Sequence, residues 1–227
     1  MRMPMSLMRI SKYIHSCLLV EDAGTRILFD PGKFSFLDGG AKAESFRDLD
    51  AVVITHQHPD HMDEEALQTI VRNNRSAVVL ASQQIAERLG AAGIAVEVLE
   101  SGSRNVGNSK VEAYAAEHAP LLNAEIPRNV AYVVGGRMLH PGDSFDRSLD
   151  VLRGIELLAL PVTAPWTNEL AVADFAGRLA PKTAFPIHDG YAKDFFLQSR
   201  HENYKNYFAK QGIEFVPLKD VGAAVER

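Results

Sequence analysis

Three histidines and an aspartate crowd one short stretch of this chain. Residues 55–63 read Thr-His-Gln-His-Pro-Asp-His-Met-Asp, which puts imidazoles at His56, His58 and His61 and a carboxylate at Asp60. Polar groups at the end of a buried strand are costly unless they are solvated or bound to something. Neutral imidazole and carboxylate together bind divalent ions such as zinc and iron. The stretch therefore indicates a metal site.

The flanking residues predict that this stretch joins a strand to a helix. Residues 51–54 form a short apolar, β-branched run, which is typical of a buried strand. Residues 64–71 predict the first turns of a helix. Asp63 is the expected N-cap, and the acidic residues that follow it suit the positive end of the helix dipole.

Further polar residues follow predicted strands downstream. His118 comes after the strand expected at 111–116, and Asp143 comes after a predicted hairpin. His188 comes after the strand expected at 183–187. A lone histidine at a strand end is usually solvated or hydrogen-bonded, so the recurrence of the pattern carries more weight than any one residue.

The pattern His56-x-His58-x-Asp60-His61, followed in order by His118, Asp143 and His188, resembles the signature of the metallo-β-lactamase superfamily. The resemblance implies two ligand sets and a bridge: His56, His58 and His118 for one metal, Asp60, His61 and His188 for the second, and Asp143 between them. It also implies a hydrolytic mechanism in which a metal-bridging hydroxide attacks the substrate and the catalytic residue Asp60 orients it or takes its proton.

The implied cofactors are two divalent metal ions. Zinc is the commonest in the superfamily, and manganese and iron are the alternatives, because imidazole-rich ligation does not separate them. Asp30 matches an aspartate of the family that would hold a histidine ring in orientation. The alternative for Asp30 is a turn-forming residue ahead of Pro31 and Gly32.

The remaining pattern predicts two sheets between outer helices. Hairpins are expected at 17–30 and at 130–140, the second with a Gly-Gly turn, and residues 10–20 are expected to be strand. Ser82 and Thr167 are expected to cap helices. The resemblance implies an α/β, four-layer αβ/βα sandwich, two mixed β-sheets flanked by helices, as a single domain over residues 1–227.

Composition argues for an ordinary globular chain, and the resemblance implies that it acts on a small molecule. Hydrophobic residues make up 46% and charged residues 23%, and the formal net charge is −5, so a nonspecific nucleic-acid binder is not expected. No apolar run approaches the length of about 20 residues that a membrane helix needs. The single Cys17, expected to be a packed core thiol, fits a reducing, cytoplasmic location. Homo-oligomerisation is left open.

Several residues outside the motif are weaker candidates. Trp166 is expected to wall the pocket or to be a packed aromatic, and Tyr191 to contact substrate or to be an ordinary loop residue. Arg128 is a candidate anion contact. We expect His140 to be a solvent-facing strand residue, and His15 and His201 to be surface or structural.

The reaction stays open at this point. The second histidine of the motif, His58, favours hydrolysis over diiron oxygen chemistry, and the interval between Asp143 and His188 is too short for the inserted domain of the nuclease branch. The compact chain resembles the branch that contains ascorbate-6-phosphate lactonase. We expect a small ester, lactone or phosphodiester substrate, with specificity in loops 31–47, 119–129 and 163–168. The alternatives are a mononuclear-iron dioxygenase of the persulfide type and a non-catalytic metal-binding protein.

Overall fold

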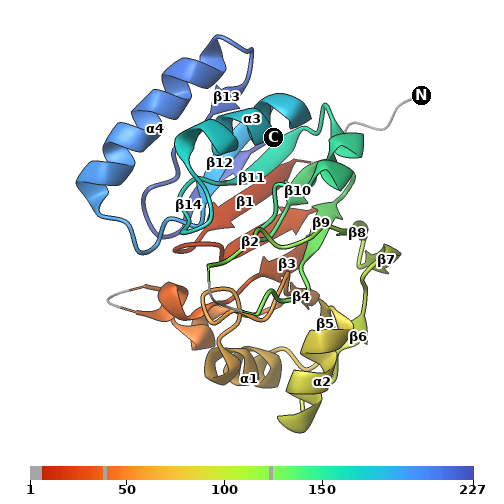
Figure 1. Cartoon of the computed structure of the whole chain (residues 1–227). Coiled ribbons are helices and arrows are strands. Elements are labelled where there is room, and N and C mark those ends of the chain that lie inside the picture. Colours follow the sequence, from red (N-terminus) through yellow and green to blue (C-terminus); the bar gives the residue numbers. More distant parts are fainter. Residues whose placement is uncertain (1–6, 38–39, 123–124) are drawn as a thin grey trace.

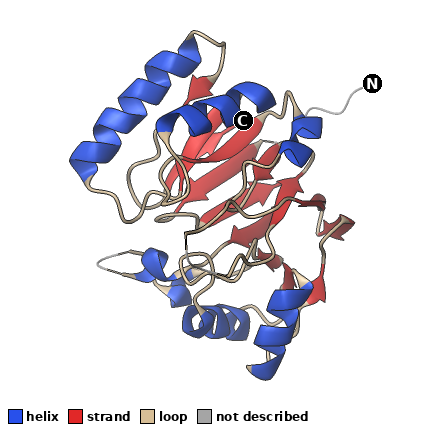
Figure 2. Ribbon diagram, in the orientation of Figure 1, coloured by secondary structure: helices blue, strands red, loops and turns tan. Residues whose placement is uncertain are grey.

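The computed structural model describes residues 7–37, 40–122 and 125–227. Over these residues the chain forms two seven-stranded β-sheets with helices on their outer faces (Figures 1 and 2). The helices are α1 (Glu64–Asn73), α2 (Gln83–Ala91), α3 (Glu169–Leu179) and α4 (Asp194–Ala209). The expected α/β sandwich of two sheets between helices is confirmed.

The first sheet is built mainly from the N-terminal half of the chain. Its strands, in the spatial order β14-β1-β2-β3-β4-β5-β6, are β14 (Ala223–Glu226), β1 (Met8–Lys12), β2 (Leu18–Asp22), β3 (Thr25–Phe29), β4 (Ala51–Val53), β5 (Val78–Ala81) and β6 (Glu97–Val98). The second sheet has the order β13-β12-β11-β10-β9-β8-β7, with β13 (Glu214–Phe215), β12 (Thr183–Ile187), β11 (Leu157–Pro161), β10 (Met138–His140), β9 (Val130–Val134), β8 (Ser109–Ala115) and β7 (Gly102–Val106).

The strand directions decide which loops meet. In the first sheet β3, β4 and β5 are parallel, and β1 runs in the same direction because it is antiparallel to β2, which is antiparallel to β3. In the second sheet β10, β11 and β12 are parallel, and β8 shares their direction through β9. Loops that follow parallel strands emerge at one edge of a sheet, where α/β proteins place their ligand sites.

Three apolar layers hold this arrangement together. Inward-facing residues of both sheets, such as Val53, Tyr132 and Phe185, form the layer between them. The neighbouring residue of β4, Val52, points the other way and packs under α1 and α2. In the second sheet Leu158 packs under α3 and α4. The alternation follows from the strand period of two, and both faces of each sheet are covered.

The local signals that predicted turns and helix starts are confirmed. A turn with Gly24 at φ +79 joins β2 to β3, and the Gly135-Gly136 turn joins β9 to β10. The Asp63 carboxylate accepts the Ala66 N–H at the start of α1. The Ser82 hydroxyl accepts an N–H at the start of α2. Cys17 is buried, as expected.

Three expectations about the elements are wrong. Residues 10–20 are not one strand, because the chain bends between β1 and β2 with His15 at φ +64. Strands β7 and β14 were not expected, since neither shows a clear alternating pattern. The cap of α3 is Asn168, whose side chain accepts two N–H groups, and not Thr167. No helix in the described part of the chain is long and apolar enough to cross a membrane.

Candidate metal centre

Two groups of metal-binding side chains meet where the strands of both sheets end. Within each group, every residue offers one nitrogen or oxygen atom, and these atoms lie within 4.8 Å of one another. One group is His56, His58, His118 and Asp143, and the other is His15, Asp60, His61 and His188. All seven residues expected as ligands are therefore brought together, and His15 joins them.

Asp143 contacts both groups. Its Oδ2 lies 3.6 Å from His118 Nε2 and 3.9 Å from His56 Nε2 in the first group. The same oxygen lies 3.0 Å from His188 Nε2, and Oδ1 lies 3.2 Å from His61 Nε2 in the second group. The loop after β10 thus places this carboxylate between the two groups.

Asp30 and Thr55 orient two of the rings. The Asp30 carboxylate accepts hydrogen bonds from His61 Nδ1 at 2.7 Å and from the Thr55 hydroxyl at 2.7 Å. Because that hydroxyl donates to Asp30, it accepts from His56 Nδ1 at 3.1 Å. In their neutral forms both rings therefore keep hydrogen on Nδ1 and direct an Nε2 lone pair toward Asp143. Asp30, itself fully buried, does more here than form a turn.

Backbone carbonyls orient two further rings in the same sense. His118 Nδ1 donates to the Ala119 carbonyl at 2.6 Å, and His188 Nδ1 donates to the Thr163 carbonyl at 2.7 Å. A carbonyl can only accept, so the hydrogen lies on Nδ1 and Nε2 is free to bind a metal ion in the neutral ring. Metal-binding histidines commonly have this arrangement.

Several buried atoms of the centre have no hydrogen-bond partner among the described residues. They are His61 Nε2, His118 Nε2 and Asp143 Oδ1. An unsatisfied buried polar atom costs roughly 1–3 kcal/mol. These atoms converge on one place and belong to side chains that prefer divalent ions, so the donor set fits a bound metal.

The charges of the centre favour ionised carboxylate. Burial opposes ionisation of Asp143, but His188 and His61 outweigh it and hold the pKa of that carboxyl well below its usual range. Burial lowers the pKa of His56 and of His58, so both rings are neutral and ready to bind a metal at neutral pH. Burial alone would lower the pKa of His61. The opposite effect of Asp143 and Asp30 is larger, so the pKa of His61 is raised overall.

Two glycines allow the loops to approach this closely. A Cβ on Gly32 would lie 1.8 Å from the Asp60 carbonyl oxygen. A Cβ on Gly142 would lie 2.1 Å from Asn129 Oδ1, and Asn129 in turn accepts the Asp143 N–H. A larger residue at Gly32 would displace the loop that carries Asp60, and one at Gly142 would displace the Asn129 side chain that holds the Asp143 backbone.

A pocket of about 280 Å³ opens over the centre. Its floor holds His58, Asp60, Asp143 and His188, and its walls are Lys33, Phe34, Pro59, Leu121, Pro165, Trp166 and Tyr191. Trp166 and Tyr191 therefore line the pocket. The loops expected to carry specificity contribute most of the other walls, although residues 38, 39, 123 and 124 of those loops lie outside the described residues.

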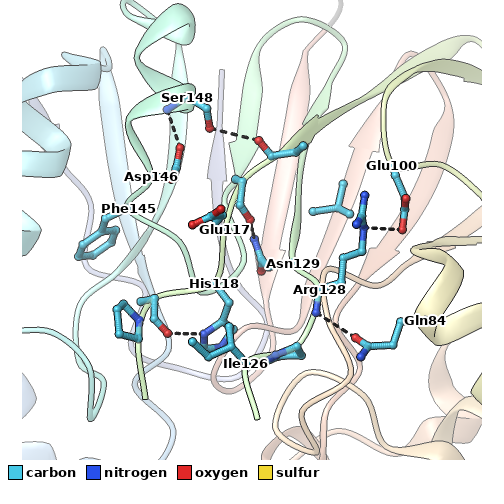
Figure 3. Close-up of a pocket in the computed structure, with 16 residues that line it drawn as sticks. Gln84, Glu100, Glu117, His118, Ile126, Arg128, Asn129, Phe145, Asp146 and Ser148 are labelled. Atoms are coloured by element: carbon cyan, nitrogen blue, oxygen red, sulfur yellow. Dashed lines mark hydrogen bonds and ion pairs between the residues drawn. The ribbon is translucent and has the colours of Figure 1, made fainter. Parts of the chain in front are cut away.

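A second cavity, of about 980 Å³, is lined in part by His118 (Figure 3). Arg128 lines it, and its guanidinium pairs with Glu100 at 2.8 Å, as Figure 3 shows. Arg128 therefore already has an acidic partner. Its role as an anion contact stays a prediction.

Three histidines differ from the expectation. His140 is fully buried and not solvent-facing, because β10 lies inside a sheet covered on both faces: its Nδ1 accepts the Gly142 N–H and its Nε2 donates to the Ser16 carbonyl. His201 and His15 are buried too, so a surface position is wrong for both. His201 packs on Phe215, outside the candidate centre.

Sequence comparisons identify relatives of the chain. A family model described as a beta-lactamase superfamily domain matches residues 9–188. Protein Rv0786c of Mycobacterium tuberculosis is 37% identical over 188 residues, which cover 80% of this chain and 84% of that protein. The UPF0173 metal-dependent hydrolase YtkL of Bacillus subtilis is 28% identical over 201 residues, covering 80% and 85% of the two chains.

A solved structure has the same fold. Igni18, a metallo hydrolase from Ignicoccus hospitalis, superposes with a TM-score of 0.77 at 18% identity and covers 98% of this chain and 99% of that one. The narrower resemblance to the ascorbate-6-phosphate lactonase branch stays a prediction. With a family model matching most of its length, the chain belongs to the β-lactamase superfamily, among its metal-dependent hydrolases of the metallo-β-lactamase fold.

Proposed function

We propose that this protein is a dinuclear metal-dependent hydrolase acting on a small ester, lactone or phosphodiester. The observation that carries the proposal is the position of Asp143. Its carboxylate contacts ring nitrogens of both ligand groups, and three of the buried atoms at these contacts make no hydrogen bond within the described residues. Metal ligation by the seven motif residues is part of the proposal.

Two ions held in these groups would polarise the bond to be cleaved and lower the pKa of a water molecule to about 7. The chain supplies the proton acceptor. Asp60 lies at the pocket floor with its side chain 24% exposed, so it can reach both the attacking water and the leaving oxygen. Burial alone would raise the pKa of Asp60. The hydrogen bond from His15 and the nearby imidazoles have a larger, opposite effect, so the pKa is lowered and the carboxylate stays ionised.

The pocket walls favour a substrate with an apolar group next to the bond. Phe34, Leu121 and Trp166 are apolar or largely apolar, and Lys33 is the only lysine or arginine among the lining residues described. Tyr191 donates its hydroxyl hydrogen to the Thr163 carbonyl at 2.8 Å. Burial raises the pKa of Tyr191 to about 12, so the hydroxyl stays protonated. Within the proposed class, these walls favour carboxylic esters and lactones over phosphodiesters.

The two alternatives lack comparable support. Relatives such as YtkL carry the name metal-dependent hydrolase, which does not favour a mononuclear-iron persulfide dioxygenase or a non-catalytic metal-binding protein. Zinc remains the first choice of metal, and manganese and iron remain alternatives. The cytoplasmic location remains a prediction from the single cysteine.

The test is a metal titration combined with a substrate panel. Protein stripped with a chelator is loaded with zinc, manganese or ferrous iron, and hydrolysis of aryl esters, lactones and phosphodiesters is measured. We expect two ions per chain and activity that is lost on stripping and restored by one of the metals. Asp143→Asn is expected to lose more than the ~10–100-fold typical of residues that only orient a ligand.

Asp174→Asn is the matched control, because Asp174 is exposed on α3 and, among the residues the structure describes, pairs only with Arg178. It should bind metal and turn over substrate like the unchanged protein. One iron per chain, with oxygen consumed in the presence of glutathione persulfide, would select the dioxygenase. A fully loaded protein inactive on the whole panel would argue for the non-catalytic alternative.

A further inference from the structure

His15 occupies an unusual position beside the candidate centre. It lies in the bend between β1 and β2 at φ +64, a backbone conformation that residues other than glycine rarely adopt. Its side chain is completely buried. Its backbone carbonyl accepts the N–H of His188 at 3.2 Å, so the bend is joined to the loop that follows β12.

Two hydrogen bonds decide which ring nitrogen of His15 carries the hydrogen. The Gly190 N–H lies 3.1 Å from His15 Nδ1, and a backbone N–H can only donate. Nδ1 is therefore the unprotonated acceptor. The hydrogen of the neutral ring is then on Nε2, which lies 3.1 Å from Asp60 Oδ2 and donates to it. With Nδ1 accepting one hydrogen bond and Nε2 donating the other, the two contacts together describe a neutral ring.

This arrangement is the reverse of the one found in the expected ligands. In their neutral forms, His118 and His188 hold hydrogen on Nδ1 and present an Nε2 lone pair. His15 presents an N–H at Nε2, and an N–H cannot bind a metal ion. One ring nitrogen of His15 lies within 4.8 Å of the ligand atoms that the rest of the second group offers, so proximity alone would make it a ligand. The hydrogen-bond pattern argues against that role.

We infer that His15 is a positioning residue that holds Asp60 through Oδ2 and thereby sets the affinity of the second metal site. The inference rests on the proposed two-metal function. Asp60 needs such support because its side chain is the more exposed of the two carboxylates, 24% against 4% for Asp143. Without the bond from His15, the carboxylate is free to turn toward the open pocket.

Close packing keeps the ring in place. A Cβ on Gly190 would lie 2.8 Å from Ile14 and 3.0 Å from the Cβ of His15, so only glycine lets the backbone N–H reach Nδ1. Phe34 meets the His15 ring edge-on with 5.1 Å between the ring centres. The same bend therefore joins the pocket wall, the loop after β12 and the histidine loop.

Two substitutions separate positioning from a merely structural role. His15→Asn offers an acceptor near the Nδ1 position and tolerates positive φ best, but it does not reach Asp60. His15→Gln offers an N–H near the Nε2 position, so it can still donate to Asp60. If His15 only stabilises the bend, Asn should be the milder change. If it positions Asp60, Gln should be the milder change.

The experiment titrates metal-free protein with zinc and with manganese by calorimetry, and follows folding by circular dichroism. We expect unchanged binding of the first ion in both variants, and binding of the second ion weakened ~10–100-fold in His15→Asn, with recovery of most of that loss in His15→Gln. Nitrogen NMR of the metal-free, unsubstituted protein should show the His15 hydrogen on Nε2.

Three results would overturn the inference. One is a His15 hydrogen on Nδ1, and another is a second-site affinity that is unchanged in His15→Asn or equally weakened in both variants. Either of these leaves two ions in the unsubstituted protein, so the proposed function survives. The third is a single ion bound by the unsubstituted protein, which overturns the two-metal proposal and the role of His15 together.

Discussion

The indole Nε1 hydrogen of Trp166 is donated to Asp143 Oδ2 at 3.1 Å. A pocket wall is thereby bonded to the carboxylate that contacts both ligand groups. Hydrogen bonds to charged groups contribute roughly 1.5–3 kcal/mol, so this bond is strong enough to affect how firmly Asp143 is held. Trp166 combines two roles that substitution can separate: an apolar surface for substrate and a donor for the candidate bridging ligand.

We predict that Trp166→Phe weakens metal binding about 10-fold while changing KM little, because it removes the donor and keeps an aromatic wall. Trp166→Ala removes both and should also raise KM for apolar esters. Metal titration and steady-state kinetics check the two effects. If Trp166→Phe binds metal like the unchanged protein, the hydrogen bond to Asp143 does not contribute to metal affinity.

We predict that metal binding strengthens as pH rises and releases protons. Burial alone would lower the pKa of His61 and of His188. Asp143 has a larger, opposite effect on both rings, and Asp30 adds to it at His61, so the pKa of both rings is raised. Both rings hold protons that an ion must displace. Calorimetry in two buffers with different heats of ionisation measures that release. A metal affinity that does not change between about pH 6 and about pH 8.5 would contradict the prediction.

The same shifts affect the metal-free chain in the opposite direction. A raised folded-state pKa contributes stability that is fully present below the unfolded value of about 6.5 and is lost as pH rises through the folded value. The metal-free protein should lose this contribution on the alkaline side, where bound metal stabilises most. The difference in Tm between loaded and metal-free protein should therefore grow from about pH 6 to about pH 8.5.

We predict that Gly32→Ala lowers both stability and metal binding. Gly32 has φ −85, which any residue adopts, so alanine would not strain the backbone. The expected loss comes from the clash of its Cβ with the Asp60 carbonyl oxygen. Overpacking of this kind typically costs about 1–3 kcal/mol, and the shift would move Asp60. Denaturant unfolding and metal titration measure the two losses.

Gly90→Ala is the control for that substitution. A Cβ at Gly90, in α2, would meet nothing within 4 Å. Alanine favours a helix over glycine by up to about 1 kcal/mol, so stability should hold or rise and metal binding should not change. Equal effects of the two substitutions would mean that close packing at Gly32 is not what matters.

Much of the fold could be predicted because its signals are local. The run before His56 is continuously apolar and rich in β-branched residues, like a buried strand; Asp63 caps the next helix, and the Gly135-Gly136 turn closes a hairpin. Such signals depend on neighbours in the chain. The histidine loop was predicted for the same reason, since its four metal-binding side chains lie within six consecutive residues.

The residues missed in the sequence depend on distant partners. His140 ends a strand whose alternation could not reveal that both faces of its sheet are covered. His15 looked like part of one continuous strand. The available signal was the polar pair His15-Ser16, which interrupts an otherwise apolar run, but nothing nearby in the chain predicts a bend at positive φ.

By itself, the sequence determined which side chains can bind metal and that they follow strands, because strand pattern and donor chemistry are properties of neighbouring residues. Only the tertiary structure decided that Asp143 stands between the two groups, that Trp166 bonds to it, and that His15 directs an N–H to Asp60. Those relations join loops that follow different strands, and in the case of Asp143 loops of both sheets, so their geometry depends on strand direction and on close packing between segments far apart in the chain.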